Sequence, residues 1–202
     1  MAEGILLIIS GPSGVGKGTV CRRLLEIRKE LKVSVSYTTR PPRHGEIDGR
    51  EYNFIDRESF EAMINKDAFL EWAVVHGYYY GTRRVAVEEA LSHGEDLILE
   101  IDVQGATQVR VKMPESVSVF LAPPSMKVLE ERIDGRGTED EQRIKDRLAT
   151  ARREMKVYHR YDYVVVNETV EKAASLINSI IDVEKCRVSR GARPPDTGGD
   201  SS

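Results

Sequence analysis

The chain has few cysteines and no long hydrophobic run, and each of these absences excludes certain classes of protein. Its two cysteines, Cys21 and Cys186, lie far apart and outside any Cys-x-x-Cys pattern. We therefore expect a reducing compartment and no cysteine-based metal site. The N-terminal apolar run is too short for a signal peptide, and no later run approaches the roughly 18 residues of a membrane span. These absences predict a cytoplasmic protein with no membrane partner.

An excess of positive charge is also missing. The formal net charge is −3 at pH 7 over 202 residues, which argues against a general nucleic-acid-binding surface. A chain of this length forms one moderate domain with room for small inserted lobes. Charged residues nevertheless make up 31% of the chain, which fits a globular protein with mobile, charged segments.

What the chain does have is a glycine-rich loop between an apolar run and a helical pattern. Such a strand–loop–helix points backbone N–H groups and the positive end of a helix dipole at one spot. Lys17 adds a full positive charge there. The loop matches the P-loop pattern, which cradles a polyphosphate. Its residues are Gly11, Pro12, Ser13, Gly14, Val15, Gly16, Lys17, Gly18 and Thr19.

The loop departs from the usual pattern at one position. Gly18 follows the lysine, and the hydroxyl comes one place later, at Thr19. In the usual pattern a Ser or Thr next to the lysine coordinates magnesium. Thr19 must do so from a shifted position or contact a phosphate instead. An ordinary turn is the alternative, but a chance match to this pattern arises in only about one chain in a hundred of this size.

Apolar strands alternate with helical patterns along the chain, which predicts an α/β fold with a central parallel sheet flanked by helices. We expect strands at 4–10, 33–37, 51–54, 69–75, 97–102, 117–121 and 163–166, with an extended piece at 78–80. We expect helices at 17–31, 57–66, 83–92, 125–135, 138–158 and 170–187. Thr138 and Glu141 would form a capping box for the fifth helix. The Gly-, Pro- and Ser-rich residues 188–202 are expected to be a disordered tail.

Two acids mark the end of the strand at 97–102. Asp102 lies where open parallel sheets place their ligands, and such an acid near a P-loop holds magnesium or its water shell. Asp102 could instead cap the helix that begins near Val103. Glu100 and Asp102 would share one face of the strand, because side chains alternate with period two. That spacing favours joint action of the two acids over capping alone.

A second anion site is indicated by the stretch Thr39-Arg40-Pro41-Pro42-Arg43. Each guanidinium presents a planar fork that matches phosphate oxygens, and the prolines reduce the cost of ordering the loop. A solvated basic loop is the alternative reading. Beside a P-loop, a second anion site suggests a second phosphorylated substrate.

These motifs resemble those of guanylate kinases, in colinear order over roughly residues 4–185. The resemblance rests on Thr-Thr-Arg-Pro-Pro-Arg at 38–43, Gly-Glu-x-x-Gly-x-x-Tyr-x-Phe at 45–54 and Phe-Leu-Glu-Trp-Ala at 69–73. It continues through Tyr-Tyr-Gly-Thr at 79–82, Glu-Ile-Asp-x-Gln-Gly at 100–105 and Arg-x3-Arg-Gly-Thr at 132–138. It implies a P-loop NTPase fold and the reaction ATP + GMP → ADP + GDP, with dGMP as a further substrate and Mg²⁺ as the cofactor.

The resemblance also implies a division of the chain and a set of roles. The core would be 4–36, 83–124 and 159–185, the GMP-binding lobe 37–82 and the lid 125–158. The glycine-rich loop would bind ATP. Arg40, Arg43, Tyr52 and Tyr80 would hold the GMP phosphate. Glu71 would accept hydrogen bonds from guanine N1–H and the 2-amino group, which adenine cannot offer. Ser36, Gly81, Thr82 and Asp102 would complete the base pocket, with Asp102 divided between base recognition and metal-bound water.

Four arginines in the expected lid region are candidates for binding ATP and the transferred phosphoryl group. Arg132, Arg136, Arg143 and Arg147 recur at near-helical spacing, which aligns them on helix faces. The resemblance implies that Arg136 and Arg147 act with Lys17 on the transferred phosphoryl group and that Arg132 binds ATP. The GMP phosphate is already ionised, so in-line transfer needs positioning and charge neutralisation but no general base.

Two other functions remain open from the sequence. A non-catalytic guanylate-kinase-like binding module would bind phosphopeptides, but such domains look degraded in the P-loop. A P-loop kinase for another nucleotide is the second alternative, and Glu71 with the paired arginines argues against it. The sequence leaves open whether the chain is a monomer or a homodimer.

Overall fold

The computed structural model describes residues 4–75, 77–134 and 141–193, with side chains described from residue 144 in the last stretch. A five-stranded parallel sheet forms the centre, in the order β2-β7-β1-β8-β9. Its strands are β1 (Leu6–Ser10), β2 (Lys32–Val33), β7 (Leu97–Glu100), β8 (Val117–Ala122) and β9 (Tyr163–Val166). The predicted α/β class with a central parallel sheet is confirmed.

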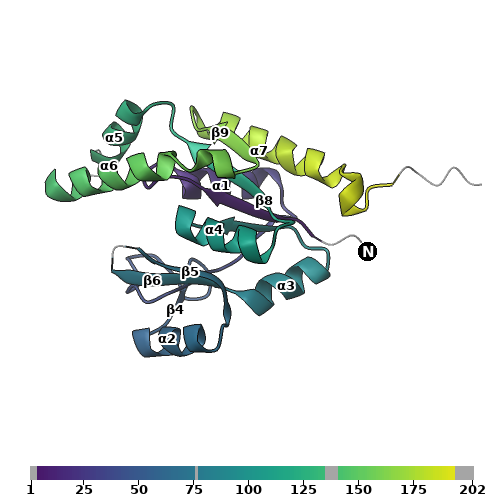
Figure 1. The fold of residues 1–202 in the computed structure, drawn as a ribbon, viewed down its shortest axis with the longest axis horizontal. Helices are drawn as coiled ribbons and strands as arrows, with labels where there is room; N and C mark the ends of the chain where they lie inside the picture. Colours follow the sequence, from purple (N-terminus) through teal and green to yellow (C-terminus); the bar gives the residue numbers. More distant parts are fainter. Residues whose placement is uncertain (1–3, 76, 135–140, 194–202) are drawn as a thin grey trace, which may run out of the picture.

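Helices cover both faces of this sheet, because β1 is apolar on both. Ile5, Leu7 and Ile9 face one cluster of buried side chains, and Leu6 and Ile8 face the other, as the period of two requires. The first face carries α1 (Lys17–Ile27), α5 (Met126–Asp134), α6 (Glu141–Met155) and α7 (Val170–Lys185). The second face carries α3 (Arg84–Ser92) and α4 (Val103–Lys112). Figure 1 shows α7 along the upper side of the sheet and α4 below it.

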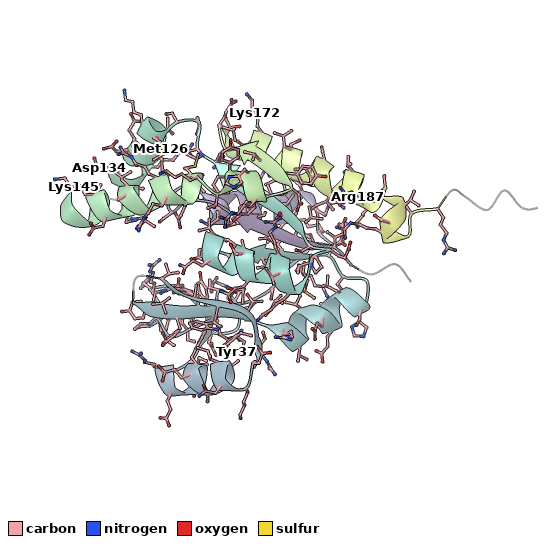
Figure 2. All side chains as sticks on the ribbon, viewed as in Figure 1. Tyr37, Met126, Asp134, Lys145, Lys172 and Arg187 are labelled. Carbon is pink, nitrogen blue, oxygen red and sulfur yellow. The ribbon has the colours of Figure 1, made fainter. Side chains whose placement is uncertain are left out.

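A second, smaller sheet lies beyond α4, in the order β4-β3-β6-β5. Its strands are β3 (Tyr37–Thr38), β4 (Asn53–Phe54), β5 (Phe69–Val75) and β6 (Tyr78–Arg83), and α2 (Arg57–Asn65) packs beneath it (Figure 1). The aromatic rings of Phe60 and Phe69 stack here, with centroids 4.4 Å apart. Figure 2 places Tyr37 in this sheet, and Asp134 and Lys145 at the far end of the α5–α6 pair.

The expected strand at 33–37 is wrong: it is two short strands in different sheets. β2 pairs with β7 of the central sheet, whereas β3 pairs with β4 and β6 of the smaller one. Residues 34–36, Ser-Val-Ser, are partly buried where the chain crosses between the sheets.

The first helix is also shorter than expected. It ends at Ile27, since Arg28 is extended, with φ −119° and ψ 94°. The Arg28 guanidinium binds Asn178 and Asp182 of α7 instead of continuing the helix. Ile27, the last residue of the helix, is 44% exposed, while Leu31 in the following loop is buried.

The strand before Asp102 ends at Glu100, two residues earlier than expected, so Asp102 lies just beyond the paired strand. Asp102 is the N-cap of α4, where its carboxylate accepts from the Gly105 N–H at 2.8 Å. The capping alternative is therefore confirmed. Asp102 itself is still extended, with φ −77° and ψ 176°, and both Glu100 and Asp102 lie in the field of Lys17.

The remaining differences are at the ends of elements. β1 begins at Leu6 and not at residue 4, and β4 covers only Asn53–Phe54 of the expected 51–54. The fifth predicted helix ends at Met155, before a short 3-10 helix (η1, Tyr158–Arg160), and its expected capping residue Thr138 lies outside the described residues. The expected disordered tail begins too early. Residues Val188–Arg190 form a 3-10 helix (η2), because Arg190 pairs with the buried Glu184 and donates to the Glu115 carbonyl. Within the described residues, no helix is long and apolar enough to cross a membrane.

Candidate active site

The glycines of the loop are required by its backbone. Gly11, Gly14 and Gly16 have φ values of 148°, 85° and 96°, a region that residues with a Cβ rarely adopt. A Cβ on Gly11 would also lie 2.2 Å from the Leu121 carbonyl oxygen. The loop therefore packs directly on the end of β8 and turns into α1 at Gly16, its N-cap.

Lys17 folds back over this loop. Its Nζ donates to the Gly11 carbonyl at 2.8 Å and lies in the field of Glu100, Glu154 and Asp102. Burial lowers the pKa of Lys17, and the three carboxylates oppose that shift. The result is an ammonium group held inside the loop with little water around it, where its attraction for an anion is strengthened.

Arg132 reaches the same loop from α5. Its guanidinium donates to the carbonyls of Val15, at 3.3 Å, and Asn167, at 3.1 Å. The Asn167 side chain donates to the same Val15 carbonyl at 2.8 Å and is buried. Asn167 comes directly after β9, so these residues join the C-terminal edge of the sheet, α5 and the loop.

Arg147 and Glu154 reach the loop from α6, and both contact Ser13. Arg147 donates to the Ser13 hydroxyl at 3.0 Å, and the Ser13 N–H donates to the Glu154 carboxylate at 3.3 Å. Burial raises the pKa of Glu154, while Lys17 and the Ser13 N–H oppose the rise. Predicted Arg136 and the side chain of Arg143 lie outside the described residues.

Gly18, the departure from the usual loop pattern, lies against Glu100. A Cβ at Gly18 would lie 3.3 Å from both carboxylate oxygens of Glu100, closer than ordinary van der Waals contact. A side chain at this position would require the Glu100 carboxylate to shift by a few tenths of an ångström. Thr19 is exposed in the first turn of α1, and its role with a metal stays a prediction.

The second predicted anion site gathers around Arg40 in the smaller sheet. The Arg40 guanidinium is buried, with bonds to the Tyr80 hydroxyl at 3.2 Å and to Glu46 at 2.8 Å. It also lies 5.4 Å from the Tyr52 ring centroid. Glu46 accepts the backbone N–H of Arg43 as well, at 2.7 Å. The structure thus brings Arg40, Tyr52 and Tyr80 together, while Arg43 lies exposed on the same loop.

The predicted base pocket is built around Glu71 on β5. This carboxylate is 3% exposed and accepts a hydrogen bond from the Thr82 hydroxyl at 2.6 Å. The Thr82 hydroxyl also lies 3.4 Å from the Ser36 hydroxyl. Burial raises the pKa of Glu71 to about 7, and the nearby Asp102 adds to the rise. Ser36, Glu71, Thr82 and Asp102 therefore meet where the smaller sheet faces α4.

Two glycines allow close packing around Glu71. Gly81 pairs with Trp72 across the β5–β6 ladder, and a Cβ on it would lie 3.0 Å from the rings of Phe60 and Phe69. A Cβ on Gly105 in α4 would lie 2.4 Å from the Glu71 carboxylate. The helix can approach this carboxylate only because residue 105 has no side chain.

Three residues of the site were missed from the sequence. Asn167 ends a parallel strand, a position that commonly carries ligand-binding side chains. Glu154 comes seven residues after Arg147, which places both on one face of α6. Glu46 follows Arg43 by three residues, a spacing that could have indicated a partner for the basic loop. No groups of three or more His, Cys, Asp or Glu within the described ranges could hold a metal ion.

A parallel sheet whose first strand runs into this lysine-bearing loop and an α-helix defines a P-loop NTPase. The family model for guanylate kinase matches residues 3–184. The chain is 51% identical over 188 residues to "Guanylate kinase" of Caldanaerobacter subterraneus subsp. tengcongensis, covering 93% of this chain and 91% of that protein. It is 52% identical over 188 residues to "Guanylate kinase" of Desulfitobacterium hafniense, covering 93% and 94%.

A solved structure agrees with these relatives. The crystal structure of guanylate kinase from Anaplasma phagocytophilum superposes with a TM-score of 0.77 at 35% identity, covering 94% of this chain and 90% of that one. The chain belongs to the guanylate kinase family.

Proposed function

We propose that the protein is an ATP:GMP phosphotransferase, a guanylate kinase that makes ADP and GDP. The observation that carries the proposal is the buried Glu71 carboxylate, set in the same sheet as the Arg40 anion site. Guanosine monophosphate needs both an acceptor for the donors of its base and a cationic site for its phosphate, and the P-loop supplies a separate site for a triphosphate. The identity of about 50% to curated guanylate kinases supports this activity.

Guanine is the base that fits this acceptor pocket. It offers two adjacent donors, N1–H and the 2-amino group, to a carboxylate such as Glu71, whereas adenine presents an acceptor at N1. Thr82, Ser36 and Asp102 lie around the carboxylate and would complete the contacts to the base, with Gly81 keeping the strand close. Arg40, Tyr52, Tyr80 and Arg43 would hold the phosphate, since GMP and dGMP carry the same one.

The donor site is assigned to residues 11–19 with Arg132. Loop N–H groups and Lys17 would hold the ATP phosphates. Arg147 and Arg136 would meet the charge on the transferred phosphoryl group. Arg147 already lies at the loop, through its bond to Ser13. Because the attacking GMP oxygen is ionised, the protein only has to align the reactants, neutralise charge and exclude water.

Mg²⁺ would enter this site with ATP. The residues present fit such an ion, because magnesium keeps several waters and binds through one or two carboxylates plus substrate phosphates. Glu100 and Asp102 lie in the field of Lys17 beside the loop, and Thr19 offers a hydroxyl. When bound, the ion neutralises charge on the phosphate oxygens. We propose water-mediated contacts near Asp102 for it and leave Thr19 as a candidate ligand.

The proposed division of labour follows the two sheets. Residues 4–36, 83–124 and 159–185 form the core, 37–82 the GMP-binding lobe and 125–158 the lid. A binding module without catalysis would have no need for Lys17 inside the loop or for Arg147 beside Ser13, and both contacts favour an enzyme.

A coupled assay tests the proposed function. The purified chain is supplied with MgATP and, in turn, with GMP, dGMP, AMP or IMP, and ADP formation is followed. We expect rapid turnover with GMP and dGMP, slower turnover with IMP and little with AMP. No turnover with any of them would indicate a binding module, and a preference for AMP would indicate another nucleotide kinase.

A further inference from the structure

The smaller sheet is attached to α4 by hydrogen bonds from a residue that has no proposed role in binding either substrate. β5 is the edge strand of that sheet, so part of its backbone has no neighbouring strand. Edge backbone groups need partners when they are covered by protein. At Trp72 the partner is a side chain from α4, Gln108, which is partly buried.

Gln108 binds both backbone groups of Trp72. The Trp72 N–H donates to the Gln108 side-chain oxygen at 3.2 Å, and the Gln108 NH₂ donates to the Trp72 carbonyl at 2.7 Å. The side-chain amide has the same donor and acceptor as a peptide group. It therefore continues the sheet by one residue and fixes β5 on the helix at the position next to Glu71.

The same face of α4 contacts β5 on both sides of this point. Gly105, Gln108 and Lys112 are spaced by three and four residues, so they lie on one face of the helix. Gly105 leaves room for the Glu71 carboxylate, and the Lys112 ammonium donates to the Phe69 carbonyl at 3.1 Å. Leu70 packs with Ala106 and Val109 in the same cluster. The backbone before and after Glu71 is thus held by one helix.

We propose that Gln108 is a positioning residue for guanine specificity. By holding both backbone groups of Trp72, it sets the distance of the Glu71 carboxylate from Gly105 and Thr82. A carboxylate that must accept from two donors on a rigid base tolerates little displacement. This inference rests on the proposed function, because it assumes that the base bound at Glu71 is guanine.

Gln108→Met is the variant that tests it. Methionine keeps the length and approximate volume of glutamine, cannot donate to the Trp72 carbonyl and offers the Trp72 N–H only a weak sulfur acceptor. We expect the KM for GMP to rise about three- to thirtyfold, the range that corresponds to weakening or losing one hydrogen bond between guanine and a displaced Glu71 carboxylate. We expect the preference for GMP over IMP, which lacks the 2-amino group, to fall by a similar factor. The KM for ATP should change by less than about twofold, because its site is on the other sheet.

Two further variants separate positioning from general stability. In Gln108→Glu one carboxylate oxygen would face the Trp72 carbonyl and a negative charge would stand near Glu71, so we expect a larger loss than with methionine. Thr107→Ala changes the next residue on the exposed side of α4 and should leave both KM values unchanged. Should Gln108→Met not fold, Gln108→Asn, whose amide is one CH₂ too short to keep both bonds, carries the same test.

The chain supplies its own probe for the binding step. Trp72 is the single tryptophan, so its fluorescence reports directly on this contact when GMP is titrated into the whole protein. We expect weaker GMP binding in Gln108→Met by the same factor as the rise in KM. A wild-type KM and a wild-type GMP-to-IMP preference in this variant, with or without a lower melting temperature, would overturn the inference. Failure of the wild-type protein to use GMP would instead overturn the proposed function.

Discussion

At the scale of a single residue, the burial of Glu71 favours its neutral form, whereas its proposed role requires the ionised form. Its carboxylate is buried, it accepts from Thr82 and lies near Asp102, and its pKa is raised to about 7. The base it is proposed to bind requires the ionised form, which can accept two hydrogen bonds. Burial therefore makes the form that binds guanine costly while the pocket is empty.

The pH dependence of GMP use follows from this pKa. Below pH 7 a growing share of the free enzyme carries protonated Glu71, which cannot accept from both guanine donors. We expect kcat/KM for GMP to rise between about pH 6 and pH 8 and then level off. The GMP phosphate titrates near pH 6 as well, so Glu71→Gln is the control, since it keeps that ionisation. An identical pH profile in the variant would contradict the assignment.

Stability should show the reverse trend. The folded-state pKa of Glu71 lies above its ordinary value of 4.5, so the folded protein binds the proton more tightly than the unfolded chain. The free energy of unfolding therefore falls as pH rises from about 4.5 to about 7, and the loss is complete above that. Glu71→Gln lacks this cost. We therefore expect the difference in free energy of unfolding, variant minus wild type, to be about 1–3 kcal/mol more positive at pH 8 than at pH 4. Urea unfolding at both pH values measures the difference, and an equal effect at both would refute it.

At the scale of elements, α6 matters because it places side chains on the glycine-rich loop. Leu148 and Ala151 hold the helix in the core, and Arg147 and Glu154 extend from it to Ser13. The helix thus connects the segment proposed as the lid to the loop proposed to hold ATP.

Removing the Arg147 guanidinium should affect turnover more than folding. We expect Arg147→Ala to lower kcat by about a hundredfold or more, the usual scale for losing one group that stabilises transition-state charge. Lys17→Ala should do the same. Arg152→Ala removes an equal charge from an exposed position of the same helix, and its kcat should stay within about twofold of wild type. Near-normal turnover in Arg147→Ala and Lys17→Ala would contradict the proposed neutralisation of charge.

The regular elements could be predicted wherever local pattern and tertiary context agree. The strand over Phe69–Val75 and the helix start at Arg57 match the structure, because an apolar run and a capping side chain, here Asp56, act locally. The strand predicted over 33–37 does not, since its pairing partners belong to two sheets that are distant in sequence. Pattern alone cannot distinguish one strand from two in that case.

The site shows the same limit. Side chains predicted from motifs, such as Lys17, Arg40 and Glu71, lie in the positions that the loop and strand patterns indicate. Asn167, Glu154 and Gln108 carry no motif of their own. Each acts through a backbone group far along the chain, Val15, Ser13 or Trp72, and such a contact exists only once the fold has formed.

For the whole molecule, the two proposed substrate sites lie on different sheets that share α4 as a neighbour (Figure 1). If the sites approach one another when both are filled, binding at one should favour binding at the other.

Thermal unfolding with ligands measures this coupling. ADP and GMP are the suitable pair, because ADP has no phosphoryl group at the gamma position to transfer. Each ligand at about a hundredfold excess over its Kd should raise the free energy of unfolding by about 2.7 kcal/mol. Together we expect them to stabilise the protein by more than the sum of the separate effects. A purely additive result would show that the two sites act independently.

The central claim is that one phosphoryl group passes directly from a nucleotide held by the glycine-rich loop to GMP held by the smaller sheet. In the most direct measurement, the purified protein is incubated with magnesium, GMP and ATP labelled in its terminal phosphoryl group, and the products that carry the label are identified. Direct transfer predicts that the label appears in GDP, with very little in inorganic phosphate. Label released only as inorganic phosphate, or retained in ATP while GMP stays unchanged, would contradict it.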